Sequence, residues 1–351
     1  MTTRLKLDFI LPGKLQTKTG GYIYDRRIVE GLKSLGWEVS LHCLDPSFPF
    51  PTVTALAHAR KIFSALHSGN LVIIDGLALS GMPDLLKEHM KRLRLIGLIH
   101  HPLALESGLS SKKRQILYKR EKQCLKIVKR TFVTSEWTKK KISDLGIPSN
   151  KIRVVIPGTD KATLTNRSFN GLINMLCVAT LTPRKGHSLL FEAVAKLPKD
   201  SWHLTCIGSL KRDIPTVKKL RAQLKRLKLI DNVTLLGEIS SEELSIHYQN
   251  TDLFVLTSHL EGYGMVLAEA VARGLPIICT DAGAISSTPA GRAAMLIPEG
   301  DLNKLTKALL TVTNEVNFLK QLANRSISVR NDLPTWDQSC EKFSAYLREI
   351  S

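Results

Sequence analysis

Two carboxylates flank a pair of glycines in the segment Glu261–Glu269, which reads Glu-Gly-Tyr-Gly-Met-Val-Leu-Ala-Glu. The apolar run Leu253–Thr257 before it predicts a strand, and the apolar residues after the second glycine predict a helix. Glycines at such a turn let a ligand approach the backbone closely, and the unpaired amides of a helix start suit a phosphate. The segment therefore predicts a phosphate-binding turn, and an ordinary helix start with one buried ion pair is the alternative.

The second carboxylate, Glu269, lies within the otherwise apolar run Met265–Ala272. A carboxylate buried there without a partner would be costly, so we expect a group that hydrogen-bonds to Glu269. A ribose diol is a good candidate, because a carboxylate can accept hydrogen bonds from two hydroxyl groups. Glu261 precedes the glycines and is expected to face a ligand from the loop.

A second loop with chemical potential contains Arg184-Lys185-Gly186-His187, between the strand-like run Asn174–Ala179 and a helical pattern over Ser188–Leu197. Arginine and lysine in such a loop can hold a diphosphate, the arginine through its planar fork and the lysine as a point charge. They can also stabilise the negative charge that builds up on a departing nucleoside diphosphate. A solvent-exposed basic loop is the alternative interpretation.

Weaker signals stand in the N-terminal half. Gly20 and Gly21 lie in a polar loop before a predicted helix, Tyr22–Leu35, where a flexible loop explains them as well as a ligand does. His100 and His101 follow a predicted strand, Leu93–Ile99. A histidine at the carboxyl end of a parallel strand points toward the usual ligand site, where it can hydrogen-bond to a substrate, although a purely structural histidine is the alternative.

The elements that position these residues alternate between strand and helix along the whole chain. The first series of predicted strands is Leu5–Leu11, Glu38–Leu44, Leu71–Ile74, Leu93–Ile99, Thr131–Thr134 and Ile152–Ile156. The second series is Asn174–Ala179, Trp202–Gly208, Val233–Leu236, Leu253–Thr257 and Pro276–Cys279. Strands that alternate with helices of 10–15 residues predict parallel sheets covered on both faces.

The two series predict an α/β protein with two doubly wound, Rossmann-like domains. A turn-rich stretch at 157–171 separates a first domain over 1–165 from a second over 171–330. A last predicted helix over 335–351 has no strand after it, so we expect it to join the first domain. Because ligands of doubly wound sheets bind beyond the carboxyl ends of the strands, we expect two facing domains with the site in a cleft between them.

Composition narrows the class of protein. The 351 residues are 43% hydrophobic, which is enough for a large core, and no apolar run is long enough to span a bilayer. The N-terminal residues lack the pattern of an export signal. The six cysteines are scattered without the spacing of a zinc site: Cys43, Cys124, Cys177, Cys206, Cys279 and Cys340. We therefore expect a cytoplasmic protein in a reducing compartment, without a bound metal.

The net charge of +19 is concentrated between Lys112 and Lys141, where only Glu121 and Glu136 oppose a run of lysines and arginines. Such a surface attracts polyanions, and the inner face of an anionic membrane is the favoured partner. A solvated helix face is the plain alternative. Nucleic acid is disfavoured, because three aromatic residues, Tyr118, Phe132 and Trp137, are too few for a base-stacking platform.

Doubly wound sheets serve many functions, so an NAD-dependent dehydrogenase or epimerase and a non-catalytic basic nucleic-acid-binding protein are alternatives at this point. The dehydrogenase is disfavoured, because Pro12-Gly13-Lys14 after the first predicted strand is not a Gly-x-Gly-x-x-Gly fingerprint.

Several motifs in order resemble those of the family 4 retaining glycosyltransferases of the GT-B fold, among the glycosyl transferases group 1. The strongest likeness is the acidic pair Glu261 and Glu269 around a Gly-x-Gly-Met core. Arg184-Lys185-Gly186 is similar to the family's basic diphosphate loop, and Val155–Asp160 is similar to the segment that closes its first domain. The likeness extends over nearly the whole chain.

The resemblance implies a role for each matching residue of the second domain. Glu269 would bind the donor ribose, and Glu261 would contact the hydroxyl groups of the donor sugar or lie near its anomeric centre. Arg184 and Lys185 would hold the diphosphate. The remaining donor-binding positions come from the glycine turn: Gly262, Tyr263, Gly264 and Met265.

For the first domain, the resemblance implies that Gly20 and Gly21 line the cleft and that His100 or His101 fills a histidine position of the site. It implies a UDP- or GDP-sugar as donor and a hydroxyl acceptor, such as a lipid-linked sugar or a cell-surface glycan. It also implies transfer without a divalent metal or another cofactor. The chain departs from the family pattern at Ala179-Thr180-Leu181, where Gly-Arg-Leu is usual, and at Ser286-Ser287, where an acidic residue is usual.

Overall fold

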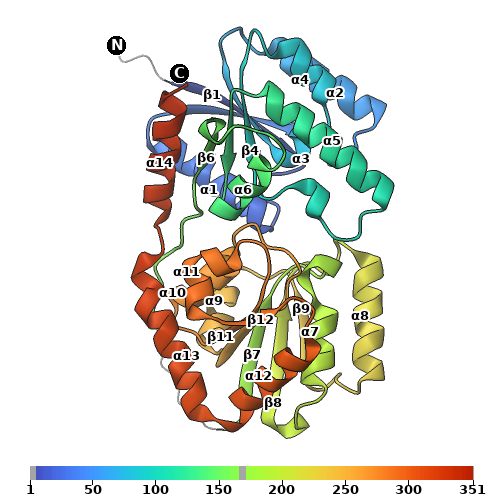
Figure 1. Ribbon diagram of the computed structural model, residues 1–351, viewed down its shortest axis with the longest axis vertical. Helices are drawn as coiled ribbons and strands as arrows, with labels where there is room; N and C mark the ends of the chain where they lie inside the picture. Colours follow the sequence, from blue (N-terminus) through green and yellow to red (C-terminus); the bar gives the residue numbers. More distant parts are fainter. Residues whose placement is uncertain (1–4, 166–170, 351) are drawn as a thin grey trace. The chain divides into compact units, whose positions relative to one another are not determined.

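The computed structural model describes residues 5–165 and 171–350. The chain divides into two compact units, which we call unit 1 (Met1–Gly158 with Pro334–Ser351) and unit 2 (Thr159–Leu333). Each unit contains a six-stranded sheet in which every described pair of neighbouring strands is parallel (Figure 1). The predicted α/β class with two doubly wound sheets is confirmed.

The sheet of unit 1 has the order β2-β1-β3-β4-β5-β6. Its strands are β1 Lys6–Pro12, β2 Glu38–Leu44, β3 Leu71–Asp75, β4 Arg94–Ile99, β5 Arg130–Val133 and β6 Ile152–Val154. The central strands are buried along nearly their whole length, as parallel strands covered on both faces must be. The chain leaves β1 toward β2 on one side and returns to β3 on the other. The carboxyl ends of β1 and β3 therefore form the topological switch point, where doubly wound sheets bind ligands.

Seven α-helices accompany this sheet among the described residues: α1 Gly20–Ser34, α2 Val53–Ala65, α3 Gly76–Leu79, α4 Pro83–His89, α5 Ser111–Ile127, α6 Glu136–Ser143 and α14 Trp336–Arg348. Helix α1 begins at Gly20, so the prediction of a polar loop at Gly20-Gly21 was wrong. The reason is that Thr19 takes the extended N-cap conformation and glycine can occupy the first helical turn without steric conflict.

The C-terminal helix α14 packs against α1 within unit 1. Thr335 begins it with a capping box, in which its side chain and that of Gln338 each bond to the other's backbone amide. The two helices approach closely at Gly31, where an added Cβ would stand 2.2 Å from the sulfur of Cys340. Ser339 donates a 2.7 Å hydrogen bond to the carbonyl of Ile156, which ties α14 to the end of the sheet.

Unit 2 repeats the design with the order β12-β11-β10-β7-β8-β9. Its strands are β7 Ile173–Val178, β8 Trp202–Ile207, β9 Val233–Gly237, β10 Leu253–Leu256, β11 Ile277–Asp281 and β12 Met295–Pro298. The order reverses between β7 and β10, so the carboxyl ends of these two strands mark the switch point of this sheet. Both chemically suggestive loops of this half, at 179–186 and 257–264, leave the sheet at those ends.

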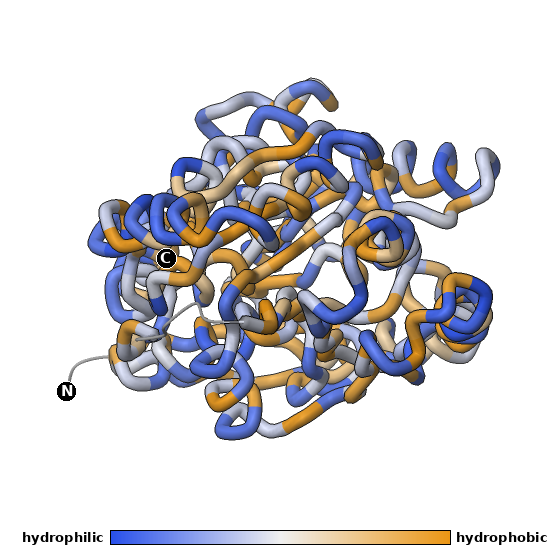
Figure 2. The backbone as a smooth tube through the Cα atoms, turned by 90° about the horizontal axis from the view of Figure 1, so that it is seen from below, coloured by the Kyte–Doolittle hydropathy of each residue, from blue (hydrophilic) through white to orange (hydrophobic). Residues whose placement is uncertain are grey.

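The α-helices of unit 2 among the described residues are α7 His187–Val194, α8 Ile214–Arg226, α9 Ser241–Gln249, α10 Met265–Ala272, α11 Pro289–Ala293, α12 Leu302–Asn314 and α13 Val316–Val329. Strand β12, which pairs with β11 and forms the edge of the sheet, was not among the predicted strands. Hydrophobic and hydrophilic stretches alternate along the chain, as amphipathic helices over buried strands require (Figure 2). Within the described residues, no helix has the length and apolarity needed to cross a membrane.

Candidate functional site

The loop after β7 and the loop after β10 are locked together at Gly186. This glycine has a φ of 66° and starts α7, and an added Cβ would stand 1.9 Å from the carbonyl oxygen of Thr257. Thr257 donates a 3.0 Å hydrogen bond to the carbonyl of Gly186, and the amide of His259 donates one of 2.7 Å to the carbonyl of Arg184. Only glycine allows so close an approach with a left-handed backbone, so the Arg184-Lys185 turn has a fixed position beside the second loop.

Glu261 lies at the centre of this arrangement and is buried. Its Oε1 accepts hydrogen bonds from Lys185 Nζ at 2.5 Å and from Ser258 Oγ at 2.6 Å. Arg184 Nη1 lies 3.9 Å from the other carboxylate oxygen and donates a 2.7 Å hydrogen bond to the carbonyl of Leu260. The side chains of Arg184 and Lys185 are only 18% and 14% exposed, so the alternative of a solvent-exposed basic loop was wrong.

The electrostatics of Glu261 follow from these contacts. Burial alone would raise the pKa of its carboxyl group, but the charges of Lys185 and Arg184 and the hydrogen bonds from Lys185 and Ser258 outweigh burial and hold the pKa below the ordinary value. Burial lowers the pKa of Lys185, against the attraction of Glu261. The sequence left open an ordinary helix start with one buried ion pair. The buried ion pair is present, and Glu261 is its carboxylate.

The glycine turn follows directly. Gly264 has a φ of 89° and forms the N-cap of α10, and Met265 is the first helical residue. The loop after β11 packs on the backbone of Glu261: an added Cβ at Gly283 would stand 2.2 Å from its carbonyl oxygen. Tyr263 is buried, and its hydroxyl forms no hydrogen bond with any described residue. The turn is therefore held on both sides, with a phenol hydroxyl left for a further partner.

Glu269 has the hydrogen-bonding partner that its apolar surroundings required. The hydroxyl of Tyr248, on α9, donates a 2.8 Å hydrogen bond to Glu269 Oε2. The guanidinium of Arg273 lies over the Tyr248 ring, 4.4 Å from its centre, and donates a 3.0 Å hydrogen bond to the carbonyl of Glu269. Tyr248 was not predicted as this partner, because nothing in the α9 sequence marks which residue faces α10. Glu269 itself is half-buried, so a ligand can still reach it.

In unit 1, His100 lies against the start of α1, where an added Cβ on Gly21 would stand 3.0 Å from Cδ2 of its ring. His100 Nε2 is 3.0 Å from Asp25 Oδ1 and 3.6 Å from Asp75 Oδ2. Burial alone would lower the pKa of His100, but the two carboxylates raise it to about 10. Burial raises the pKa of Asp25 to about 6, against the pull of His100. Neither aspartate stands out in the sequence, because nothing in α1 or β3 alone marks it as a partner of His100.

The neighbouring His101 has a different partner, Glu106, whose Oε2 lies 3.2 Å from its Nε2. The loop that follows is anchored to α5 by Glu121, which accepts a 3.1 Å hydrogen bond from the amide of Leu103. Burial raises the pKa of Glu121 to about 7. The two adjacent histidines are therefore held by separate acidic groups, and His100 is the one that lies against Gly21 of α1.

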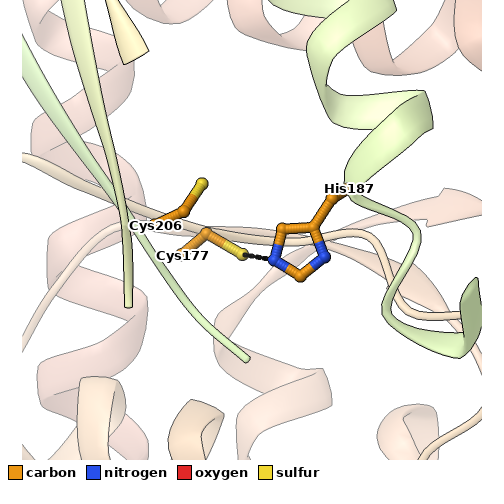
Figure 3. A group of neighbouring side chains, drawn as sticks. All are labelled: Cys177, His187 and Cys206. Atoms are coloured by element: carbon orange, nitrogen blue, oxygen red, sulfur yellow. Dashed lines mark hydrogen bonds between the residues drawn. The ribbon is translucent and has the colours of Figure 1, made fainter. Parts of the chain in front are cut away.

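Two groups among the described residues bring three potential metal ligands within 4.8 Å of one another. One is Asp25, Asp75 and His100. The other, shown in Figure 3, joins Cys177 and Cys206 on neighbouring strands with His187 at the start of α7.

In this second group, which is fully buried, Cys177 Sγ lies 3.8 Å from His187 Nε2. A hydrogen bond from Cys206 lowers the pKa of Cys177 to about 5, helped by His187 and opposed by burial. The residue types suit zinc, but this contact also ties α7 and the Arg184-Lys185 turn to β7 without an ion.

Comparison with known proteins finds a similarity to one family in the C-terminal half. Residues 165–328 match the family model described as glycosyl transferases group 1. The putative colanic acid biosynthesis glycosyltransferase WcaL of Salmonella typhimurium is 29% identical over 183 residues, which cover 48% of this chain and 44% of that protein. The MMP alpha-(1->4)-mannosyltransferase of Mycolicibacterium hassiacum is 25% identical over 335 residues, which cover 91% and 80%. The chain thus spans about half the length of the first relative and most of the second.

Solved structures agree on the fold. Sucrose-phosphate synthase of Thermosynechococcus elongatus aligns with a TM-score of 0.83 at 19% identity, over 99% of both chains. The Anabaena protein Alr3699/HepE, crystallised with UDP and glucose, aligns with a TM-score of 0.77 at 17% identity, over 99% of this chain and 100% of that one. The GT-B fold and the likeness to group 1 glycosyl transferases are confirmed.

Proposed function

We propose that this chain, whose residues 165–328 match the family model of the glycosyl transferases group 1, transfers a sugar from a UDP- or GDP-sugar to a hydroxyl acceptor with retention of the anomeric configuration. The observation that carries the proposal is the contact of Lys185 and Arg184 with Glu261 at the switch point of unit 2. Two cations, a carboxylate and a glycine-capped helix start are the groups that a sugar diphosphate requires.

A bound diphosphate would compete with Glu261 for Lys185 and Arg184, because it carries more negative charge than one carboxylate. The two cations would then stabilise the charge that develops on the departing nucleoside diphosphate. Glu261 would stay beside the sugar, where a carboxylate stabilises positive charge at the anomeric carbon. Retention follows if the acceptor attacks on the side of the leaving group and a phosphate oxygen takes its proton. The proposal includes no metal and no cofactor, because the protein's own cations neutralise the diphosphate.

The experiment that tests this proposal is a ligand panel followed by an assay. We expect UDP or GDP to raise the melting temperature of the protein, and the matching nucleotide sugar to release nucleoside diphosphate. Stabilisation by NAD with no response to either diphosphate would support a dehydrogenase instead. Release of no nucleotide from any nucleotide sugar, with a broad set of hydroxyl acceptors present, would contradict the proposal.

The proposed contact between Glu269 and the donor ribose gives a sharper prediction. Glu269→Gln is expected to weaken nucleoside diphosphate binding about 10- to 100-fold, since hydrogen bonds to a charged group contribute about 1.5–3 kcal/mol. Tyr248→Phe should weaken binding about 3- to 10-fold, because it removes the hydroxyl that orients the carboxylate. Isothermal titration calorimetry with the preferred diphosphate measures both effects.

The control for this prediction is chemical. The ligand for this control is a 2′,3′-dideoxynucleoside diphosphate, which lacks the ribose hydroxyl groups. The wild-type protein should bind it as weakly as Glu269→Gln binds the ribonucleotide. The Glu269→Gln variant should bind both ligands with the same affinity. Equal affinity of the wild-type protein for both ligands would rule out a ribose contact at Glu269.

We also propose that the acceptor is carried by an anionic membrane at its cytoplasmic face, and that α5 provides the contact. The outward positions of α5 include Lys112, Lys113, Arg114, Lys119 and Lys126, all of which are exposed. The acidic residue of this helix, Glu121, is buried and does not offset them. Tyr118 on the same helix is 45% exposed, and tyrosine is favoured at membrane interfaces.

Glutamine at Lys112, Arg114, Lys119 and Lys126 is expected to weaken binding to vesicles that contain anionic lipid by at least about 10-fold, since each basic residue near such a surface contributes about 1 kcal/mol. Vesicle sedimentation at low salt measures the effect. The matched control replaces four exposed basic residues of α8 in unit 2: Lys218, Lys219, Arg221 and Lys225. Equal loss in both variants would show that net charge alone governs binding, and equal binding to neutral and anionic vesicles would exclude the membrane contact.

A further inference from the structure

Three ionisable side chains meet at the switch point of unit 1. Asp25 comes from the second turn of α1, Asp75 is the last residue of β3, and His100 follows the last residue of β4. Asp25 is 1% exposed, Asp75 is 5% exposed, and the His100 side chain keeps 20% of its surface. The cluster is therefore built from three segments and opens to solvent mainly through the histidine.

The contacts of His100 determine which ring nitrogen is available. Nε2 faces both carboxylates, and the edge of the ring beside it lies on Gly21. The ring packs edge-on against Tyr24, with 5.4 Å between the ring centres, and the backbone carbonyl of His100 accepts a 3.0 Å hydrogen bond from Thr134. Nδ1 forms no hydrogen bond with any described residue. The ring is thus held from several sides, and Nδ1 is the ring nitrogen left for a further partner.

We propose that Asp25 and Asp75 are positioning residues for His100: they fix its ring with Nε2–H turned into the protein and Nδ1–H presented as a hydrogen-bond donor to an oxygen atom of the ligand. The family resemblance implies a ligand contact for a histidine in this region, and the pair of carboxylates behind it is the new element. Only the kinetic consequence rests on the proposed glycosyltransferase function. The orientation and protonation of His100 do not.

Electrostatics support the geometry. A histidine can donate from both nitrogens only as the imidazolium, and the two carboxylates raise the pKa of His100 far enough to keep it charged at neutral pH, although burial opposes them. Asp25, Asp75 and the neutral phenol of Tyr24 are the titratable groups that face the ring. The folded-state pKa of His100 lies above the ordinary histidine value. The stabilisation of the folded protein by the charged ring is therefore fully present at pH values below the ordinary histidine pKa, and it is lost as the pH rises through about 10.

Selective ¹⁵N-labelling of the histidines tests the proposal without any substrate, with His100→Gln to assign the resonances. In the wild-type protein we expect both ring nitrogens of His100 to remain protonated at pH 8. In Asp25→Asn, which keeps the shape of the side chain, the apparent pKa of His100 should fall by at least one unit. Asp75→Asn should cause a smaller fall, because that carboxylate is farther from Nε2.

Folding and local effects are controlled within unit 1. Asp75 Oδ1 also caps α3 through a 2.9 Å hydrogen bond from the amide of Leu77, and asparagine preserves such a cap. Asp8→Asn is the matched control, since Asp8 is also buried and bonds to a histidine, His42, at 2.7 Å. It should leave the His100 resonances unchanged.

The kinetic arm uses the pH profile of kcat/KM for the nucleotide sugar. The alkaline limb of this profile should shift to lower pH by at least one unit in Asp25→Asn but not in Asp8→Asn. A purely structural role of Asp25 would not produce this shift. If no nucleotide sugar is turned over, the proposed function fails and the resonances still decide this proposal.

A neutral His100 in the wild-type protein at pH 8, or an unchanged titration in Asp25→Asn, would overturn it. Stoichiometric zinc binding that depends on Asp25 would also overturn it, because a metal requires the imidazole as a deprotonated ligand.

Discussion

Replacing Glu261 with glutamine is expected to reduce the rate of sugar transfer about 100- to 1,000-fold while leaving nucleoside diphosphate affinity unchanged or somewhat higher. Glutamine keeps the volume of the side chain but removes the negative charge that would stabilise the positively charged anomeric carbon. Lys185 and Arg184 remain in place and lose the carboxylate that competes with phosphate for them. Initial rates at saturating donor, with calorimetry of diphosphate binding, separate the two effects.

The control for this prediction is Glu299→Gln. Glu299 is an exposed carboxylate that forms an ion pair with His259, a residue of the loop that contains Glu261. Its replacement should alter neither the rate of transfer nor the affinity for the diphosphate. Ser258→Ala removes one of the hydrogen bonds to Glu261 and should give an intermediate loss of rate. A Glu261→Gln variant that keeps its turnover but loses diphosphate affinity would reverse the roles assigned to Glu261 and Glu269.

Breaking the same ion pair from the other side is expected to affect stability. Lys185→Met should lower the free energy of unfolding at pH 7 by about 3–5 kcal/mol, because it leaves Glu261 buried with its closest cation removed. The double variant Lys185→Met/Glu261→Gln should recover most of that loss, since a neutral amide is far less costly to bury than a charge. Urea denaturation followed by circular dichroism measures both.

The pH dependence gives an independent check on this pair. In the wild-type protein the folded-state pKa of Glu261 lies below its unfolded value, so its stabilising contribution is present above the unfolded pKa and is lost as the pH falls through the folded one. Without Lys185, burial dominates and raises the folded-state pKa, so the deficit of Lys185→Met should shrink as the pH falls. Lys304→Met removes a 65% exposed lysine and should change stability by less than about 0.5 kcal/mol. A similar loss of stability in Lys304→Met would contradict the explanation by a buried ion pair. A loss of stability in Lys185→Met that does not depend on pH would contradict it too.

Much of the architecture followed from local patterns in the sequence. Strand periodicity, apolar helix faces and turn residues depend on neighbours a few positions apart, so they identified two series of parallel strands and the loops that leave them. The Arg184-Lys185 loop and the Glu261–Glu269 turn are predicted to bind a ligand for the same reason, because doubly wound sheets bind their ligands at loops beyond the carboxyl ends of strands. An error at Gly20-Gly21 was also local, since glycine is compatible with both a loop and a first helical turn.

The pairing of side chains was decided only by the tertiary structure. Lys185 and Glu261 are 76 positions apart, and nothing in either loop alone shows that the carboxylate takes the lysine as its partner. Likewise, a costly carboxylate at Glu269 predicts that some partner exists, but the packing of α9 against α10 determines that it is Tyr248.

The aspartates around His100 come from α1 and β3, and they meet it because the order of strands in the sheet places those carboxyl ends side by side. The sequence by itself thus determined which segments leave the carboxyl ends of the strands. The folded chain determined which charges face one another, because that depends on contacts between residues far apart in sequence.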